Sequence, residues 1–178
     1  MSDRGSRGER EDKSGRILAE MVREIGGEVL SHQVLPDEKE KIVEWLVRMV
    51  DHQGLDLVLT TGGTGIAARD VTPEATREVI ERELPGFGEV MRMKSVEVTP
   101  RGMLSRMTAG SRGQALILNL PGSPKAVREC FGWVIGAIPH AIELLKGEAG
   151  ECGQEEPSQA DVKRRELRSL GSDLDESG

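Results

Sequence analysis

Apolar residues recur at helical spacing in two early segments of this chain. In residues 12–25 they return every three or four positions, which predicts a helix that ends at Gly26. Residues 36–54 show the same spacing and predict a second helix. Asp37 is followed by Glu40 in the manner of a capping box, so Asp37 is expected to cap the start of this helix.

Two continuous apolar runs have the length of strands, Leu55–Thr60 and Ala115–Leu120. Such runs are typical of strands that are buried on both faces of a parallel sheet. The mixed segment 27–35 is a further strand candidate. Helical patterns are also predicted at about 72–84, where Thr72 is the expected N-cap, at 86–95, and from Pro124 to about 147.

Helical and strand patterns therefore alternate along most of the chain. This order predicts βαβ units and a three-layer α/β/α sandwich with a mostly parallel sheet. The length of 178 residues favours one domain, placed at residues 1–147. Residues 148–178 hold nine acidic and four basic side chains and few apolar ones, and they are expected to form a disordered tail.

Composition excludes several classes of protein. No apolar run approaches the roughly 20 residues that span a bilayer, and the first residues are too polar for a secretory signal, so a cytoplasmic protein is expected. The net charge of −7 falls largely on the tail, which contributes −5 and leaves −2 for the body. With no basic stripe and 2% aromatic residues, the body is a poor match for nucleic-acid binding.

The most informative segment for chemistry is the loop that follows the first apolar run. Glycines at the carboxyl end of a strand let backbone N–H groups approach an anion, and threonine hydroxyls add donors. A tight turn that requires positive φ explains the glycines equally well. A phosphate-binding P-loop is excluded because no lysine follows in place. The loop reads Thr60, Thr61, Gly62, Gly63, Thr64, Gly65.

Two aspartates are candidate ligands for a hard cation. Asp70 lies just beyond the glycine loop, and Mg²⁺ commonly uses such a carboxylate when it also binds substrate phosphates. A solvated loop carboxylate is the alternative for Asp70, and capping is the alternative for Asp37. Ser123, at the start of the last helical region, is a candidate phosphate donor or an ordinary turn residue. Arg106 is interpreted as a solvated side chain, although contact with a phosphate stays open.

Several motifs together resemble one known family, the molybdopterin adenylyltransferases, which includes the bacterial enzyme and the G domain of gephyrin. The resemblance extends over about residues 2–146. The motifs that carry it are Asp12-Lys-Ser-Gly15, Leu57-Val-Leu-Thr-Thr-Gly-Gly-Thr-Gly65, Arg69-Asp-Val-Thr-Pro73, Leu84-Pro-Gly-Phe-Gly88, Leu104-Ser-Arg106 and Asn119-Leu-Pro-Gly-Ser-Pro124.

The resemblance implies a molybdopterin-binding α/β fold and transfer of AMP from Mg·ATP to molybdopterin. It assigns Asp37, in Pro36-Asp37-Glu38, and Asp70 to catalysis and to Mg²⁺. It also implies a homotrimer and hand-off of the product to a molybdenum-insertion protein. The residues that it assigns to substrate binding are Thr60, Thr61, Gly62, Gly63, Thr64, Gly65, Asn119, Pro121, Gly122, Ser123, Ser2 and Asp3.

One departure concerns the start of the chain. Family members begin with an apolar strand that delivers a Ser-Asp turn, here Ser2-Asp3, to the site. That strand is absent from this sequence, so the sheet is expected to lack it. An interior strand that is missing leaves backbone groups unpaired, at a cost of about 1–3 kcal/mol for each buried group. Our hypothesis is that the natural protein begins upstream of Met1.

Two other functions share some of these features. A non-catalytic module that only binds molybdopterin would need the same phosphate contacts. The related nucleotide-hydrolysing domain of the competence-damage family has a similar loop, but its loop usually reads Gly-Gly-Leu-Gly and a paired Asp-Asp follows. Thr64 and the single Asp70 argue against that family.

Overall fold

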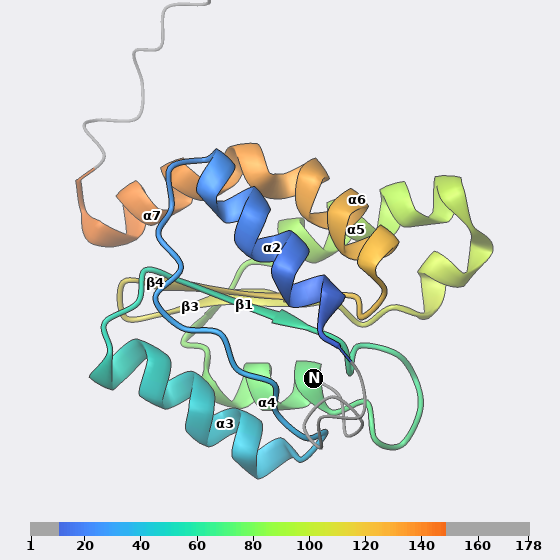
Figure 1. Cartoon of the computed structure of the whole chain (residues 1–178), viewed down its shortest axis with the longest axis horizontal. Helices are drawn as coiled ribbons and strands as arrows, with labels where there is room; N and C mark the ends of the chain where they lie inside the picture. The colour runs from blue at the N-terminus through green and yellow to red at the C-terminus, as the bar shows by residue number, and fades with distance from the viewer. Residues whose placement is uncertain (1–10, 149–178) are drawn as a thin grey trace, which may run out of the picture. The chain divides into compact units, whose positions relative to one another are not determined.

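Helices cover both faces of a four-stranded sheet in the computed structural model, which describes residues 11–148 (Figure 1). The helices are α2 (Lys13–Glu24), α3 (Lys39–Val47), α4 (Thr72–Val79), α5 (Pro85–Val98), α6 (Pro124–Val134) and α7 (Ile138–Lys146). Three short helical turns are η1 (Arg48–His52), η2 (Pro100–Leu104) and η3 (Ile135–Ala137). The strands are β1 (Leu57–Thr61), β2 (Arg82–Glu83), β3 (Ala109–Arg112) and β4 (Ala115–Leu120).

The sheet has the strand order β1-β4-β3-β2. β1 and β4 are parallel, as predicted, and they carry the two apolar runs. The other two pairings are antiparallel, so the α/β fold is confirmed but the sheet is mixed rather than mostly parallel. The cause is local: Arg112 pairs with Ala115 across a two-residue hairpin loop, and Gly113 adopts φ +53° there.

Each face of the sheet has its own apolar core. α2, α5, α6 and α7 pack on one face, and α3 with α4 packs on the other (Figure 1). β4 contributes to both cores, since Leu116 and Leu118 face the first and Ile117 faces the second. All six residues of β4 are buried, as expected for a strand that lies between two neighbours and two helical layers.

The predicted helices agree with α2 and with α3 followed by η1, but one cap was wrong. Glu38 occupies the N-cap position of α3, and no side chain caps that helix. Asp37 therefore does not begin the helix as an N-cap. Thr72 was likewise predicted as an N-cap and instead is the first residue of α4, after the N-cap Val71.

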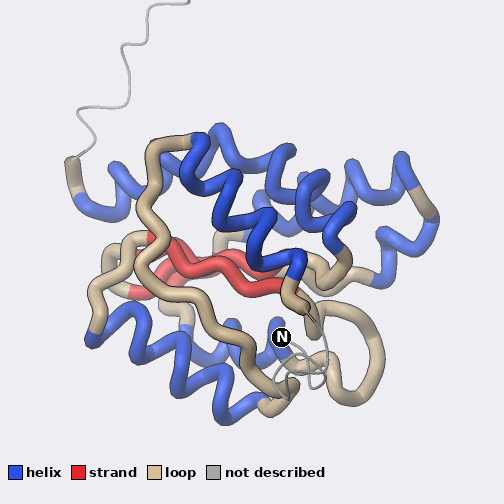
Figure 2. Tube along the Cα trace, in the orientation of Figure 1, coloured by secondary structure: helices blue, strands red, loops and turns tan. Residues whose placement is uncertain are grey.

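The segment 27–35 is not a strand, contrary to the prediction. It runs as an extended loop from α2 towards α3 (Figure 2). Among the described residues, Glu28–Pro36 form no backbone–backbone hydrogen bond. A strand requires a neighbour to pair with, and this segment has none because β1 pairs only with β4 in the part of the chain that is described. β1 is consequently an edge strand there.

Some expectations fall outside the described residues. These are Ser2, Asp3 and almost all of the acidic tail, of which only Glu148 is described. Within residues 11–148, no helix is long and apolar enough to cross a membrane.

Candidate functional site

The carboxyl ends of β1 and β4 lie side by side. Thr60 pairs with Asn119 in parallel register, and beyond the strand end Gly62 N donates to Leu120 O at 3.1 Å. A Cβ added to Gly122 would lie 3.1 Å from the Gly62 Cα, so the two loops that leave the strands are in close contact. This is the edge of an α/β sheet where ligands commonly bind.

Glycine is required at Gly63 for two independent reasons. Its φ is +63°, a left-handed conformation that side chains disfavour. A Cβ at Gly63 would also overlap Thr72 Oγ1 and would lie 3.4 Å from Asp37 Oδ1. The loop therefore turns tightly enough to bring the Gly63 backbone against the start of α4 and against Asp37, two segments that are far apart in the sequence.

Asp70 closes the same loop from the other side. Its Oδ2 accepts a hydrogen bond from Ala67 N at 2.8 Å, and its own N–H donates to Ala67 O at 2.8 Å. A Cβ at Gly65 would lie 2.7 Å from Asp70 Oδ2, so Gly65 leaves room for the carboxylate. A carboxylate that accepts one hydrogen bond has further acceptor capacity for a cation or a water molecule.

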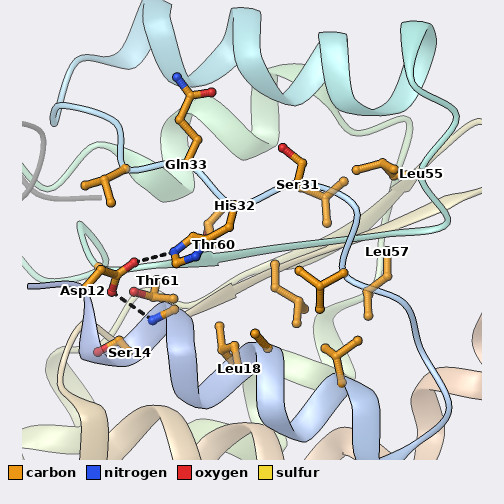
Figure 3. Close-up of a pocket in the computed structure, with 18 of the residues that line it drawn as sticks. Asp12, Ser14, Leu18, Ser31, His32, Gln33, Leu55, Leu57, Thr60 and Thr61 are labelled. Atoms are coloured by element: carbon orange, nitrogen blue, oxygen red, sulfur yellow. Dashed lines mark hydrogen bonds and ion pairs between the residues drawn. The ribbon is translucent and has the colours of Figure 1, made fainter.

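A cavity of about 820 Å³ opens beside β1 and ends at these loops (Figure 3). Its lining unites many of the predicted site residues, which come from both strand ends and from the start of α3. These are Asp37, Thr60, Thr61, Gly62, Gly63, Asp70, Gly122 and Ser123. Thr64, Gly65, Asn119 and Pro121 do not line the cavity.

Asn119 supports the strand ends from inside the protein. It is fully buried, and its Nδ2 donates to Thr60 Oγ1 at 2.9 Å and to Thr76 Oγ1 at 2.8 Å. The side chain thus ties β4 to β1 and to α4. These two hydrogen bonds give the Asn119 amide a structural role. The predicted contact of Asn119 with substrate stays a prediction.

Ser123 begins α6 at the second loop. Its Oγ accepts a hydrogen bond from Ala126 N at 3.2 Å, which makes it the N-cap of the helix. The first N–H groups of α6 and the positive end of its dipole therefore lie at the same sheet edge as the glycine loop. Such a helix start favours an anion.

A family model described as "Probable molybdopterin binding domain" matches residues 1–140. The chain belongs to this molybdopterin-binding family. It is 47% identical over 148 residues to the molybdopterin adenylyltransferase of Helicobacter pylori strain J99, which covers 82% of this chain and 84% of that protein. It is 41% identical over 169 residues to the molybdopterin adenylyltransferase of Escherichia coli K12, which covers 87% of each.

Solved structures agree with the family assignment. The molybdopterin biosynthesis enzyme MoaB of Thermus thermophilus is similar to this chain with a TM-score of 0.77 and 49% identity, over 82% of this chain and 92% of that one. The molybdopterin-binding fold that the resemblance implied is confirmed. The fold alone is also shared with CinA of Thermoplasma acidophilum, at 19% identity and a TM-score of 0.58.

Arg106 is a site residue whose role sequence reasoning missed. Its Nε donates to Gly65 O at 2.6 Å, and its other nitrogens contact Asp70 O and Glu74. Its backbone N–H also donates to Thr64 O. The interpretation as a solvated side chain was wrong, because the guanidinium bonds to Gly65 O and Asp70 O, the two ends of the segment that leads from the glycine loop to Asp70. The Leu104-Ser-Arg106 motif of the molybdopterin-binding family was the available signal.

Arg106 and its acidic partner are also linked electrostatically. Partial burial raises the pKa of Glu74, but its hydrogen bonds to its own backbone N–H and to Arg106 lower that pKa by more, so the net shift is downward. Glu74 is therefore ionised at neutral pH and keeps the guanidinium in place beside the loop.

The start of α2 closes the cavity on the side of the β4 turn. Ser14 Oγ donates to Gly122 O at 2.9 Å, and Asp12 caps α2 by accepting from Gly15 N at 2.9 Å. Asp12 Oδ2 also lies 2.9 Å from His32 Nε2 (Figure 3). A Cβ at Gly15 would overlap both Asp12 and His32, which explains the glycine in this family motif. An aspartate just before a helical pattern indicates the cap, but only the family motif could have indicated the contacts with Gly122 and His32.

The residues present fit a magnesium ion that is shared with substrate phosphates. In residues 11–148 no group of three or more His, Cys, Asp or Glu side chains could hold a metal by itself. Mg²⁺ typically uses one or two carboxylates and completes its shell with water and phosphate oxygens. Asp37 and Asp70 line one cavity and offer such oxygens, and Thr72 Oγ1 is a buried hydroxyl beside Gly63 without a hydrogen-bond partner in the described part.

Proposed function

We propose that this protein is a molybdopterin adenylyltransferase of molybdenum-cofactor biosynthesis. One observation carries the proposal: two glycine-containing strand ends and two aspartates, Asp37 and Asp70, line one cavity in a chain that is 47% identical to a molybdopterin adenylyltransferase. The substrates are ATP and molybdopterin, and the products are adenylyl-molybdopterin and pyrophosphate.

The reaction joins two phosphate groups. An oxygen of the molybdopterin terminal phosphate attacks the α-phosphorus of ATP, the P–O bond to the β-phosphate breaks, and pyrophosphate leaves with that electron pair. A phosphate monoester with a second pKa near 6 is already mostly dianionic at neutral pH, so no general base is required. Repulsion between the two anions is the main obstacle, and positioning with charge neutralisation is the protein's task.

The chain's own groups supply that positioning. The backbone N–H of Gly63 and the first turn of α6 behind Ser123 supply the donors that would anchor phosphates, whereas the Gly62 N–H is already bonded to Leu120 O. Asp37 and Asp70 would hold Mg²⁺, which when bound neutralises phosphate charge. Arg106 keeps Gly65 and Asp70 in register through its contacts with their carbonyl groups.

A homotrimer is the assembly that we favour, followed by hand-off of the product to a molybdenum-insertion protein. Support for an assembly comes from large apolar side chains that α5 and η2 leave exposed in the described chain. They are Val90, Met93, Val96, Val98, Met103 and Leu104. Contiguous exposed apolar residues of this kind commonly mark an interaction surface.

Pyrophosphate release separates the enzyme from a non-catalytic binding module. Purified protein is incubated with ATP and Mg²⁺, with and without molybdopterin, and pyrophosphate is measured over time. An adenylyltransferase releases pyrophosphate only when molybdopterin is present. A module that binds molybdopterin without turnover releases none, and that result would contradict the proposal. Release without molybdopterin would indicate nucleotide hydrolysis instead.

A further inference from the structure

Arg106 lies in a segment that has no regular secondary structure of its own. Residues 105–108 connect η2 to β3 and belong to neither element. Ser105 N donates to Gly102 O at 3.2 Å, which fixes the start of this segment to η2. Because the Arg106 guanidinium bonds to the loop beside the reaction site, the position of that loop depends on how firmly residues 105–108 are held.

Arg92 of α5 holds the segment from the other side. Its Nη1 donates to Met107 O at 2.7 Å, directly after Arg106 in the chain. Met107 is 2% exposed, and a buried carbonyl that loses its donor is costly. In residues 11–148 Arg92 forms no ion pair, so its observed polar contact is this carbonyl rather than a surface carboxylate. The hydrogen bond therefore limits how far the Arg106 backbone can shift.

Gly88 leaves room for this hydrogen bond. It lies four residues before Arg92 on α5, and residues at this spacing share one face of a helix. A Cβ at Gly88 would lie 2.7 Å from Met107 O and 3.0 Å from Arg92 Nη1. Gly88 does not have a positive φ, so backbone conformation does not require glycine there. The close approach of Met107 O explains the glycine that ends the family motif Leu84-Pro-Gly-Phe-Gly88.

We propose that Arg92 is a positioning residue for the adenylyl transfer. It holds Met107 O, and the preceding residue Arg106 bonds to the loop that presents Asp70. Arg92 does not line the cavity, so it acts through Arg106 and not through contact with a substrate. The effect on catalysis rests on the proposed function, whereas the effect on the loop is measurable without turnover.

Amide hydrogen exchange tests the link to the loop in the full chain. The Ala67 and Asp70 amides report on the loop, because Ala67 N donates to Asp70 Oδ2 and Asp70 N donates to Ala67 O. Arg92→Met keeps a long side chain without a donor, so both amides should exchange about 5-fold faster. Lys94→Met, at an exposed position of the same helix, is the matched control and should leave both rates unchanged.

A third amide distinguishes a local effect from general loosening. Leu84 N donates to Ala109 O at 2.9 Å, where α5 begins beside β3. Its exchange rate should stay unchanged in Arg92→Met. Equal acceleration of the Leu84 amide and the loop amides would mean that α5 as a whole has come loose, and it would overturn the proposal.

Gly88→Ala tests the same contact without changing Arg92. The added methyl group presses on Met107 O, so the Ala67 and Asp70 amides should again exchange faster, although alanine favours the helix more than glycine does. Gly86→Ala is the control, because an added Cβ at this position of α5 meets no atom within 4 Å. Equal loop exchange in the two glycine variants would contradict the proposal.

Kinetics separate positioning from packing. In Arg92→Met we expect kcat to fall about 5-fold and the Mg²⁺ concentration for half-maximal activity to rise, while KM for molybdopterin stays unchanged. Arg92→Lys retains a donor and should keep most of the wild-type kcat. Wild-type kcat and magnesium dependence in Arg92→Met would overturn the proposal. A wild-type protein without turnover would contradict the proposed function instead, and loop exchange in Arg92→Met would still decide whether Arg92 holds the loop.

Discussion

At the scale of single residues, the site depends on a few side chains that hold backbone in place. Arg106 is the clearest example, since its guanidinium contacts Gly65 O, Asp70 O and Glu74 together. Asp12 has a comparable role at the start of α2, where it accepts from Gly15 N and contacts His32. Neither residue needs to touch a substrate in order to affect the reaction.

Replacing Arg106 should impair turnover more than folding. Arg106→Lys keeps the positive charge but loses the planar guanidinium that bonds to several groups at once, so Asp70 is no longer held in position. We expect kcat to fall about 10-fold and the Mg²⁺ concentration for half-maximal activity to rise. Arg101→Lys, at an exposed position of η2, is the matched control and should be neutral. An Arg106→Lys variant with wild-type kcat and magnesium dependence would remove Arg106 from the positioning role.

Asp12 should make stability depend on acid pH. Burial raises the pKa of its carboxyl, but the Gly15 N–H and His32 lower it by more, so the folded-state pKa lies below the ordinary value of 3.8. The carboxylate therefore contributes stability in full above that ordinary value and loses it as pH falls through the folded-state pKa. Asp12→Asn still caps α2. Between about pH 5 and about pH 3, the Tm of this variant should fall less than the Tm of the wild type. Equal losses in thermal melts would contradict this assignment.

At the scale of elements, the site is the junction of two strand-to-helix connections. The loop from β1 to α4 turns through Gly62 and Gly63, and the turn from β4 to α6 ends at the cap Ser123. Parallel pairing of β1 with β4 places both connections at one edge. The two loops therefore act as a unit, and a change in one alters the space available to the other.

Adding a methyl group at Gly63 tests this tight junction. Gly63→Ala must carry a left-handed φ and displace Thr72 Oγ1, so we expect KM for ATP to rise at least about 10-fold and Tm to fall by several degrees. Gly113→Ala is the control, because Gly113 has φ +53° with no atom within 4 Å of an added Cβ. In Gly113→Ala the Tm should fall because of backbone strain alone, and KM for ATP should stay unchanged. Equal changes in KM in both variants would show that the close approach of Gly63 to Thr72 does not matter for ATP binding.

These elements differ in how well the sequence predicts them. β1 and β4 are continuous apolar runs, so their parallel pairing could be predicted. Burial on both faces holds for β4, whereas alternate residues of β1 are only partly buried. β3 was missed because Ala109-Gly-Ser-Arg112 is short and lacks large apolar side chains, and its place depends on pairing with β4 rather than on its own composition. The segment 27–35 was predicted as a strand from local pattern, but the described residues provide no neighbouring strand to pair with it.

The site residues also differ in how well the sequence predicts them. Asp70, Gly63 and Ser123 could be placed together because each follows a predicted strand end, and the structure brings them to one cavity. Asp37 required the family resemblance, since capping alone was a sufficient explanation before the structure placed the N-cap at Glu38. Contacts between remote segments, such as those of Arg106, follow from packing, and only the family motif that contains Arg106 pointed to them.

At the scale of the whole molecule, we expect two surfaces of the described chain to have different roles. The carboxyl edge of the sheet holds the proposed reaction site. Exposed apolar side chains gather instead on α5 and η2, elements that contact each other. We expect that this second surface, rather than the reaction site, is buried between subunits.

A charge on α5 should dissociate the assembly. Met93 is 69% exposed, so Met93→Glu should leave the fold intact and shift the protein from trimer to monomer in light scattering coupled to size-exclusion chromatography. Glu97→Gln, an exposed polar position on the same helix, serves as the control and should remain trimeric. A wild-type protein that is monomeric over the accessible concentration range would contradict the assembly.

The most direct test of the whole account compares turnover with binding in Asp70→Asn. Asparagine can still accept from Ala67 N, so the loop should keep its fold, but the carboxylate for Mg²⁺ is lost. With saturating Mg²⁺, formation of adenylyl-molybdopterin, followed by mass spectrometry, should fall about 100-fold or more while Kd for molybdopterin changes little. Wild-type product formation by Asp70→Asn would contradict the central claim that carboxylates at this sheet edge bring a metal ion between the two phosphates.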